Sequence, residues 1–207
     1  MILNTRPMQT PANKIIDLYE RHAGAWDSDR GKSLFEKPWL DRFRAAMGCD
    51  TSILDIGCGS GEPIARYFIE TGHAVTGVDS SASLIRTCGE RFADQTWIVA
   101  DMRRLSLGRC FGGLIAWDSF FHLSPDDQRG MFPVFKAHAK PGAALLFTSG
   151  PDQGEAIGSF QGEPLYHASL AASEYETLLA ENGFETLAHV VEDRTCGGHT
   201  VWLARST

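Results

Sequence analysis

A short apolar run that ends in closely spaced glycines limits most strongly what this chain can fold into. The run, Ser52 to Ile56, has the length of a buried strand, and the segment Gly57-Cys58-Gly59-Ser60-Gly61 follows it directly. Glycine adopts backbone conformations closed to other residues and lets a ligand approach the main chain. Because a helix is predicted to begin near Glu62, its free amides would face the same ligand. The segment therefore predicts a ligand site at the carboxyl end of a buried strand.

Strands and helices alternate through the middle of the chain. Apolar runs predict further strands at 74–78, 96–100, 111–117 and 143–148. The intervening segments predict helices at 63–71, 82–92 and about 125–139, the last beginning with a capping serine and a first-turn proline. This alternation predicts an α/β fold with a parallel, doubly wound sheet. Right-handed crossovers then place the carboxyl ends of its strands on one edge.

The two ends of the chain follow other patterns. The first dozen residues, with Pro7 and Pro11, predict a loose lead-in, followed by helical spacing from Ile15 to Tyr19. A loop is predicted from Gly24 to Gly31 and a helix from Lys37 to Met47. Near the other end, the sequence predicts a loop at 150–162, a helix at 171–182, and an antiparallel hairpin of 184–191 with 199–204.

Size and composition exclude several classes of protein. The 207 residues suffice for one domain, and a net charge of −7 disfavours a nucleic-acid partner. Five cysteines without CxxC spacing, and no recognisable secretion signal, favour a cytoplasmic protein with reduced thiols and no metal site. No apolar run reaches the roughly 20 residues of a membrane span.

The spacing of the glycines separates two classes of nucleotide cofactor. A dinucleotide fingerprint needs GxGxxG, and counting from Gly57 its third glycine would fall at Glu62. The chain has GxGxG instead, preceded by Asp55. A nicotinamide-dependent dehydrogenase is therefore disfavoured.

The glycine loop and three downstream segments together resemble class I S-adenosylmethionine (SAM)-dependent methyltransferases. These segments are Asp79 at the end of the second strand, Asp101-Met102 at the end of the third, and the fourth-strand run 114–123. The resemblance covers roughly Leu18 to Arg205, as in small single-domain bacterial-type members. It implies a Rossmann-like methyltransferase fold, a doubly wound, seven-stranded, mostly parallel sheet with the last strand antiparallel and helices on both faces. It also implies one domain, 1–207, with a helical lid at 1–48 and a SAM-binding core at 49–207.

The resemblance implies that SAM is the cofactor and S-adenosylhomocysteine (SAH) its product. Asp79 would accept hydrogen bonds from the ribose, and Asp101 from the adenine amino group, although either could be a helix cap or turn residue. Tyr19 and Trp117 could instead be packing residues. The predicted cofactor-binding residues are Tyr19, Asp55, Gly57, Cys58, Gly59, Gly61, Asp79, Ser80, Asp101, Met102 and Trp117.

Methyl transfer needs alignment of an acceptor with the cofactor, and some acceptors need a base. His122 and Asp118 follow the fourth strand and are the candidates, with a buried packing role as the alternative for His122. His199, in the last strand, is predicted to be structural. The predicted substrate-binding residues are Trp26, Arg30, Phe121, Tyr166 and His167, of which Trp26 and His167 could also serve packing or capping.

The sequence therefore predicts a methyltransferase acting on a small molecule, as a monomer or homodimer, with no nucleic-acid or membrane partner. Only about twenty residues lie between the fifth strand and the last helix, which leaves no inserted domain for a large acceptor. Two alternatives stay open, a methyltransferase acting on a protein or nucleic acid, and a protein that binds SAM or SAH without turnover. The attacked atom stays open as well.

Overall fold

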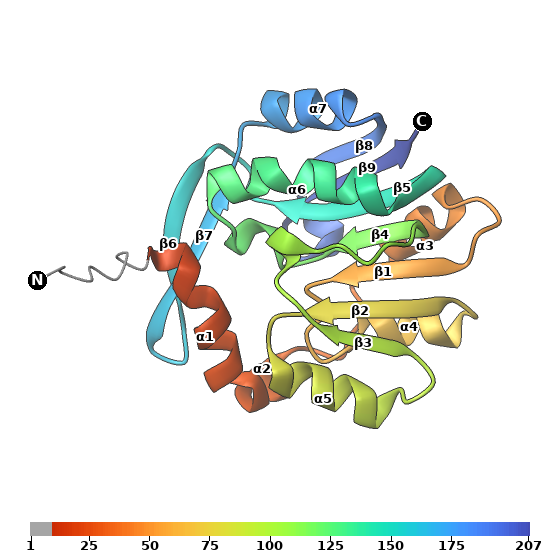
Figure 1. Ribbon diagram of the computed structural model, residues 1–207. Helices are drawn as coiled ribbons and strands as arrows, with labels where there is room; N and C mark the ends of the chain where they lie inside the picture. Colours follow the sequence, from red (N-terminus) through yellow and green to blue (C-terminus); the bar gives the residue numbers. More distant parts are fainter. Residues whose placement is uncertain (1–9) are drawn as a thin grey trace, which may run out of the picture.

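A seven-stranded sheet forms the centre of the computed structural model, which describes residues 10–207 (Figure 1). The strand order is β3-β2-β1-β4-β5-β9-β8. The strands of this sheet are β1 (Ser52–Ile56), β2 (Ala74–Asp79), β3 (Thr96–Val99), β4 (Phe111–Ala116), β5 (Ala139–Ser149), β8 (Phe184–Asp193) and β9 (His199–Ser206).

The pairing pattern confirms the predicted sheet. β1 pairs in parallel with β2 and with β4, β2 with β3, and β4 with β5. The last strand, β9, runs antiparallel to both of its neighbours, β5 and β8. The chain order reverses between β1 and β4, so the carboxyl ends of these two strands flank the position where open α/β sheets bind ligands.

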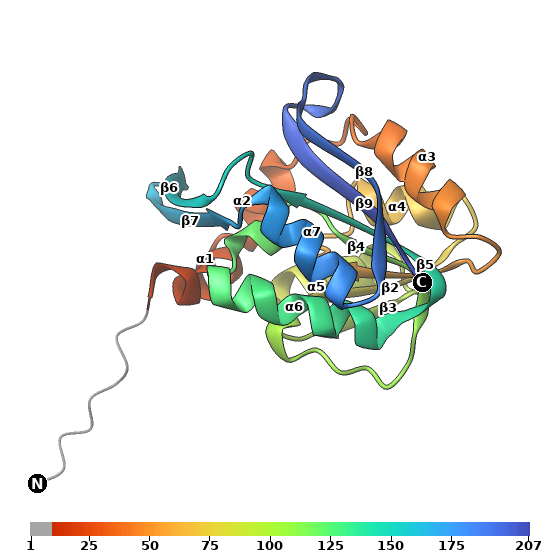
Figure 2. The ribbon, with the colours of Figure 1, turned by 90° about the horizontal axis from the view of Figure 1, so that it is seen from above.

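Helices cover both faces of the sheet (Figure 2). α6 (Pro125–His138) and α7 (Ala172–Glu181) pack on one face, where Phe120, Phe132 and Phe147 are fully buried. α3 (Lys37–Ala46) and α4 (Ile64–Glu70) pack on the other face through a second buried cluster. α5 (Ala82–Arg91) lies beside β2 and β3. Short 3-10 helices lie at η2 (Met102–Arg104), η3 (Phe120–His122) and η4 (Arg194–Cys196).

The predicted loop at 150–162 is wrong for most of its length. β6 (Gly154–Phe160) and β7 (Glu163–Ser169) form a separate antiparallel hairpin. Gln161 and Gly162 connect them, both with positive φ, which is the geometry that matches the twist of a two-residue hairpin turn. Six of the seven β6 residues are exposed, so no apolar alternation marks them as a strand.

The amino-terminal segment lies across the carboxyl ends of the strands, together with the hairpin (Figure 1). It consists of η1 (Pro11–Lys14), α1 (Ile15–Arg21) and α2 (Ala23–Asp29). The predicted loop at 24–31 is therefore wrong, because α2 occupies most of it and is held by tertiary contacts described below. The predicted lead-in at Pro7 lies outside the described residues, whereas Pro11 begins η1.

The remaining predicted elements are confirmed to within a few residues. α6 begins as expected, with the Ser124 hydroxyl accepting a hydrogen bond from the Asp127 amide and Pro125 in the first turn. β5 begins four residues before its predicted start at Ala143. In the described part of the chain, no helix has the length and apolar character needed to cross a membrane.

Candidate functional site

The main pocket lies at the carboxyl ends of β1, β2 and β4, under α1 and α2. Its wall is formed by the glycine loop on one side and by α1 on the other. Ten of the predicted site residues line it, namely Tyr19, Trp26, Gly57, Gly59, Asp79, Ser80, Asp101, Met102, Asp118 and His122. The fold thus brings together residues that lie up to 103 positions apart in the chain.

The glycine loop follows the surface of the pocket closely. Gly57 has φ 79°, and a Cβ there would lie 2.3 Å from the Cβ of Ser119. Gly59 has φ 57°, and a Cβ there would lie 3.0 Å from Nε1 of Trp26. Both positions therefore need glycine for conformation and for space. Gly61 instead faces the ring of Phe92 and lies outside the pocket lining, so its role in this structure is packing.

Asp79 connects the second strand to the glycine loop. Its Oδ2 accepts a hydrogen bond from the Gly59 amide at 3.0 Å, and its Oδ1 accepts one from the Ser81 amide at 2.9 Å. Burial raises the pKa of this carboxyl to about 6, against the effect of the amide donors. Each oxygen retains a lone pair, so Asp79 can still accept hydrogen bonds from a ligand.

Asp55 is buried below the loop rather than in the pocket wall, and only 4% of it is exposed. Burial, and then the neighbouring charge of Asp79, raise its pKa to about 7. The Cys58 side chain also lies outside the pocket lining, and burial raises the pKa of its thiol. The side chains of these two predicted cofactor residues therefore point away from the pocket lining.

The far end of the pocket is bounded by the end of β3. Asp101 caps η2 by accepting a hydrogen bond from the Arg103 amide at 3.0 Å. Its carboxylate also binds the Arg103 guanidinium at 2.9 and 2.6 Å. Burial acts to raise the pKa of Asp101, but the guanidinium and amide donors of Arg103 together lower it below its usual value. Ala12, Ile15 and Ile16 form an apolar wall near this end.

A hydrogen-bonded chain of three residues lies at the near end. Tyr19 Oη lies 2.8 Å from His122 Nε2, and His122 Nδ1 lies 2.8 Å from the Tyr166 carbonyl. A carbonyl can only accept, so we assign the imidazole proton to Nδ1, which leaves Nε2 to accept from the Tyr19 hydroxyl. Burial lowers the pKa of His122 to about 4 and raises that of Tyr19. Nε2 of neutral His122 thus accepts a hydrogen bond from the Tyr19 hydroxyl, and Tyr19 in turn lines the pocket.

Asp118 lies beside this chain, directly after β4. It has φ 49°, a left-handed conformation uncommon for residues other than glycine, and its amide donates to Thr148 Oγ1 at 2.9 Å. His199 Nε2 lies 3.0 and 3.2 Å from the two oxygens of its carboxylate. Trp117, predicted to contact cofactor, is instead 4% exposed, and its ring packs against His199 with centroids 5.5 Å apart.

The predicted substrate-binding residues divide between two places. Trp26 lines the main pocket, and its ring packs edge-on against Tyr19 at 5.2 Å. Phe121 and His167 line a second pocket beneath the hairpin, and the His167 ring lies 4.9 Å from that of His122. Two others lie in neither. Tyr166 is buried and donates its hydroxyl to Glu155, and Arg30 forms an ion pair with the buried Glu36.

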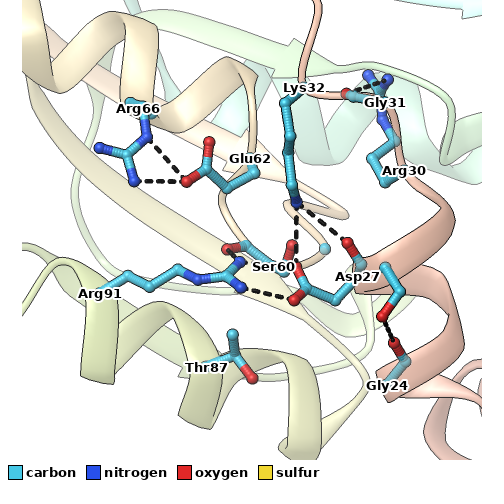
Figure 3. A network of polar contacts seen from close by, with 12 residues as sticks. Gly24, Asp27, Arg30, Gly31, Lys32, Ser60, Glu62, Arg66, Thr87 and Arg91 are labelled. Carbon is cyan, nitrogen blue, oxygen red and sulfur yellow. Dashed lines mark hydrogen bonds and ion pairs between the residues drawn. The ribbon is translucent and has the colours of Figure 1, made fainter.

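Ion pairs hold the amino-terminal segment over the pocket (Figure 3). Arg91 of α5 binds the Asp27 carboxylate with two nitrogens at 2.5 and 2.6 Å, and donates to the Ser60 carbonyl of the glycine loop at 3.4 Å. Lys32 forms an ion pair with the same Asp27 carboxylate. These contacts order α2 where the sequence alone favoured a loop.

Sequence reasoning missed several residues of this site. Arg103 lines the pocket, Phe160 of the hairpin stacks on Tyr19 at 5.9 Å, and Glu20 accepts a hydrogen bond from the Ser81 hydroxyl. Arg103 adjoins the predicted Met102 and could have been found by that adjacency. No local pattern distinguishes Phe160 or Glu20 from ordinary surface residues.

The fold and this pocket define a class I Rossmann-like methyltransferase architecture. Residues 53–142 match the family described as a methyltransferase domain. Over 150 residues the chain is 31% identical to a malonyl-[acyl-carrier protein] O-methyltransferase from Pseudescherichia vulneris, an alignment that covers 72% of this chain and 55% of that protein. The chain thus spans about half the length of this curated relative.

Solved structures share the fold at lower identity. An amino pentose methyltransferase from Micromonospora echinaspora superposes with a TM-score of 0.71 at 21% identity, covering 89% of this chain and 96% of that one. The magnesium protoporphyrin IX methyltransferase of Synechocystis gives 0.74 at 15% identity, covering 96% and 100%. The 1,6-didemethyltoxoflavin-N1-methyltransferase of Burkholderia thailandensis gives 0.73 at 20%, covering 98% and 92%. Residues 53–142 thus form a methyltransferase domain, and the described chain has the fold of the class I SAM-dependent enzymes.

Proposed function

We propose that this protein transfers a methyl group from SAM to a small-molecule acceptor and releases SAH. The observation that carries the proposal is a single pocket that runs from Asp101 and Asp79, past Gly57 and Gly59, to the side chains of Tyr19, Asp118 and His122. In this proposal η1, α1 and α2 of the predicted lid segment 1–48 cover the pocket, whereas α3 packs on the sheet with the SAM-binding core 49–207, and residues 1–9 lie outside the described residues.

The pocket residues fit the parts of SAM. Asp79 has free lone pairs for the ribose hydroxyls. Gly57 and Gly59 contribute only main chain to the pocket lining, which suits a close approach of the methionine portion. Asp101 and Met102 line the end of the pocket that is proposed for the adenine. Tyr19 and Trp26 present aromatic rings, which favour a nearby cation such as the sulfonium.

Bound SAM would supply a methyl group on a positively charged sulfur. That methyl would pass to a lone pair of the acceptor, and the electrons of the carbon–sulfur bond would remain on sulfur. The acceptor proton passes to Tyr19 Oη while the Tyr19 proton moves to His122 Nε2, 2.8 Å away. Asp118 would orient the acceptor through a hydrogen bond. Acceptors that are already ionised need no such proton path.

The acceptor site is proposed to lie on the side of the second pocket, where Phe121 and His167 adjoin His122. A small acceptor is supported by the short hairpin that is the only segment between β5 and α7. It is also supported by relatives whose names specify an amino pentose and didemethyltoxoflavin. A second candidate is an acceptor carried on a protein, because the curated relative is named for a malonyl-acyl carrier protein.

The net charge of −7 supports a protein that does not bind nucleic acid. The five cysteines are all free thiols, which supports a reducing, cytoplasmic location.

The proposal is tested in two stages. Thermal shift with SAM, SAH and NAD should show stabilisation by the first two, because a ligand that binds only the folded state raises its melting temperature. Stabilisation by NAD alone would contradict the proposal. Methyl-labelled SAM is then incubated with a fractionated metabolite extract, with an acyl carrier protein and with tRNA. A labelled metabolite is expected. Label only on the carrier protein or tRNA would favour a macromolecular acceptor. The absence of label from every fraction would favour a protein that binds SAM or SAH without turnover.

A further inference from the structure

Asp118 needs an external partner to hold its carboxylate in the pocket. Its backbone is fixed by the left-handed φ of 49° and by the amide bond to Thr148 Oγ1. These contacts leave the side-chain torsions free. Asp118 lines the main pocket next to the Tyr19–His122 pair, and the orientation of its carboxylate is set by the hydrogen bond between His199 Nε2 and Oδ2 at 3.2 Å, with Oδ1 lying 3.0 Å from the same nitrogen.

The imidazole of His199 is fixed by contacts at both ring nitrogens and on both faces of the ring. Its Nδ1 lies 2.7 Å from the Cys196 carbonyl, which can only accept a hydrogen bond. Its Nε2 faces the Asp118 carboxylate, which when ionised is also only an acceptor. Its ring lies between Trp117 and Phe35, with centroids 5.5 Å from each and interplanar angles of 31°.

Both ring nitrogens of His199 therefore act as donors, which makes it an imidazolium. The acidic groups that face it are Asp118 from the loop after β4 and Glu36 from the start of α3, and Glu36 is also bound by Arg30. The hydrogen bond to Asp118 is the largest cause of a raised pKa at His199, against the effect of burial. The site thus contains a charged histidine, His199, and a neutral one, His122.

This charge state excludes His199 as the base for the acceptor, because neither nitrogen has a free lone pair. We propose that His199 is a positioning residue, which fixes the Asp118 carboxylate toward the acceptor and acts on methyl transfer only through Asp118. The inference rests on the proposed function. Asp118 can hold the acceptor N–H or O–H in line with the methyl only while its carboxylate is fixed, and small misplacements of reacting groups cost large factors in rate.

His199→Phe separates positioning from packing. Phenylalanine preserves the aromatic ring between Trp117 and Phe35 and removes the donor to Asp118. With the acceptor identified by the labelling assay, we expect turnover to fall by about 10- to 100-fold. SAM affinity by calorimetry should stay within about twofold, since His199 lies outside the cofactor wall. His199→Gln, which places an amide donor near the position of Nε2, should recover part of the loss.

The decisive comparison uses Asp118→Asn as background. If His199 acts through Asp118, then His199→Phe added to Asp118→Asn should cause no further loss of turnover, because the partner it positions is already gone. Independent, multiplying losses would overturn the proposal, as would full activity of His199→Phe. Arg205→Gln is the matched control, because it removes an exposed ion pair from the same strand, β9, and should leave turnover unchanged.

Histidine NMR tests the ion pair without any acceptor. His199 should be protonated at pH 7, and Asp118→Asn should lower its pKa. A neutral His199 at pH 7 in the unmodified protein would overturn the inference even if methyl transfer is found. A charged His199 in a protein that transfers no methyl group would instead contradict the proposed function, and with it the positioning role.

Discussion

The hydroxyl of Tyr19 lies 2.8 Å from Nε2 of His122, although 103 positions separate the two residues in the chain. The contact joins α1 of the amino-terminal segment to η3 at the end of β4, and so forms only when that segment lies over the pocket. Tyr166 fixes the opposite nitrogen of the imidazole through its carbonyl. The pair thus connects a pocket-lining hydroxyl to a buried, neutral base.

Substituting either member of this pair should slow methyl transfer and leave the affinity for SAM unchanged. We expect His122→Gln to reduce turnover by roughly 100-fold or more, the usual range for a general base. Tyr19→Phe should give a loss of similar size, since the proton reaches Nε2 through the hydroxyl. Activity should decline as pH falls toward about 4, where His122 becomes protonated. If His122→Gln retains turnover within a few-fold of wild type, His122 has a structural role, and catalysis depends only on alignment of the acceptor with the methyl group.

Asp79→Asn should weaken SAM binding by on the order of 1–3 kcal/mol, because the ribose hydroxyls lose a charged acceptor. Folding should survive, since the amide oxygen of asparagine can still accept a hydrogen bond from the Gly59 or Ser81 amide. Calorimetry measures the affinity, with Asp94→Asn, an exposed position between α5 and β3, as the control. An unchanged affinity for SAM would show that Asp79 only stabilises the conformation of the glycine loop and does not bind the ribose.

Gly57→Ala and Gly72→Ala form a matched pair at positions with similar φ, 79° and 86°. A Cβ at Gly72 has nothing within 4 Å, so alanine there should cost only the backbone strain, about 1 kcal/mol. A Cβ at Gly57 would lie 2.3 Å from Ser119, so the same change should cost at least about 2 kcal/mol. Only Gly57→Ala should impair SAM binding. Chemical denaturation and calorimetry provide the two measurements, and equal effects of both substitutions would refute the close approach.

Asp55→Asn should stabilise the ligand-free protein more at pH 8 than at pH 5. Burial raises the folded-state pKa of Asp55 to about 7, whereas the unfolded value is about 4. Between these values the folded protein binds the proton more tightly, so its stability falls as pH rises toward 7, and the asparagine variant escapes that loss. The gain should grow by on the order of 2 kcal/mol from pH 5 to pH 8. Denaturation curves with the same difference at both pH values would show that Asp55 is not protonated in the fold.

Local signals were sufficient for the alternating core. The strand at β1, the capped start of α6 and the hairpin of β8 with β9 depend on apolar runs, a serine cap and turn residues that act within a few positions. The glycines at 57 and 59 were recognisable for the same reason, because the ability to adopt a positive φ is an intrinsic property of glycine. Family resemblance then selected Asp79, Asp101 and the segment after β4.

The amino-acid sequence by itself determined the class of fold, the cofactor loop and the residues around it, because these follow from local backbone preferences and the period of apolar residues. Only the tertiary structure decided the covering of the pocket. α2 is ordered by a distant partner, since Arg91 binds Asp27, whereas β6 is ordered by its pairing with the neighbouring strand β7. The charge states of His122 and His199 were likewise undetermined by the sequence, since that of His122 follows from its burial and that of His199 from a carboxylate brought to it from far along the chain.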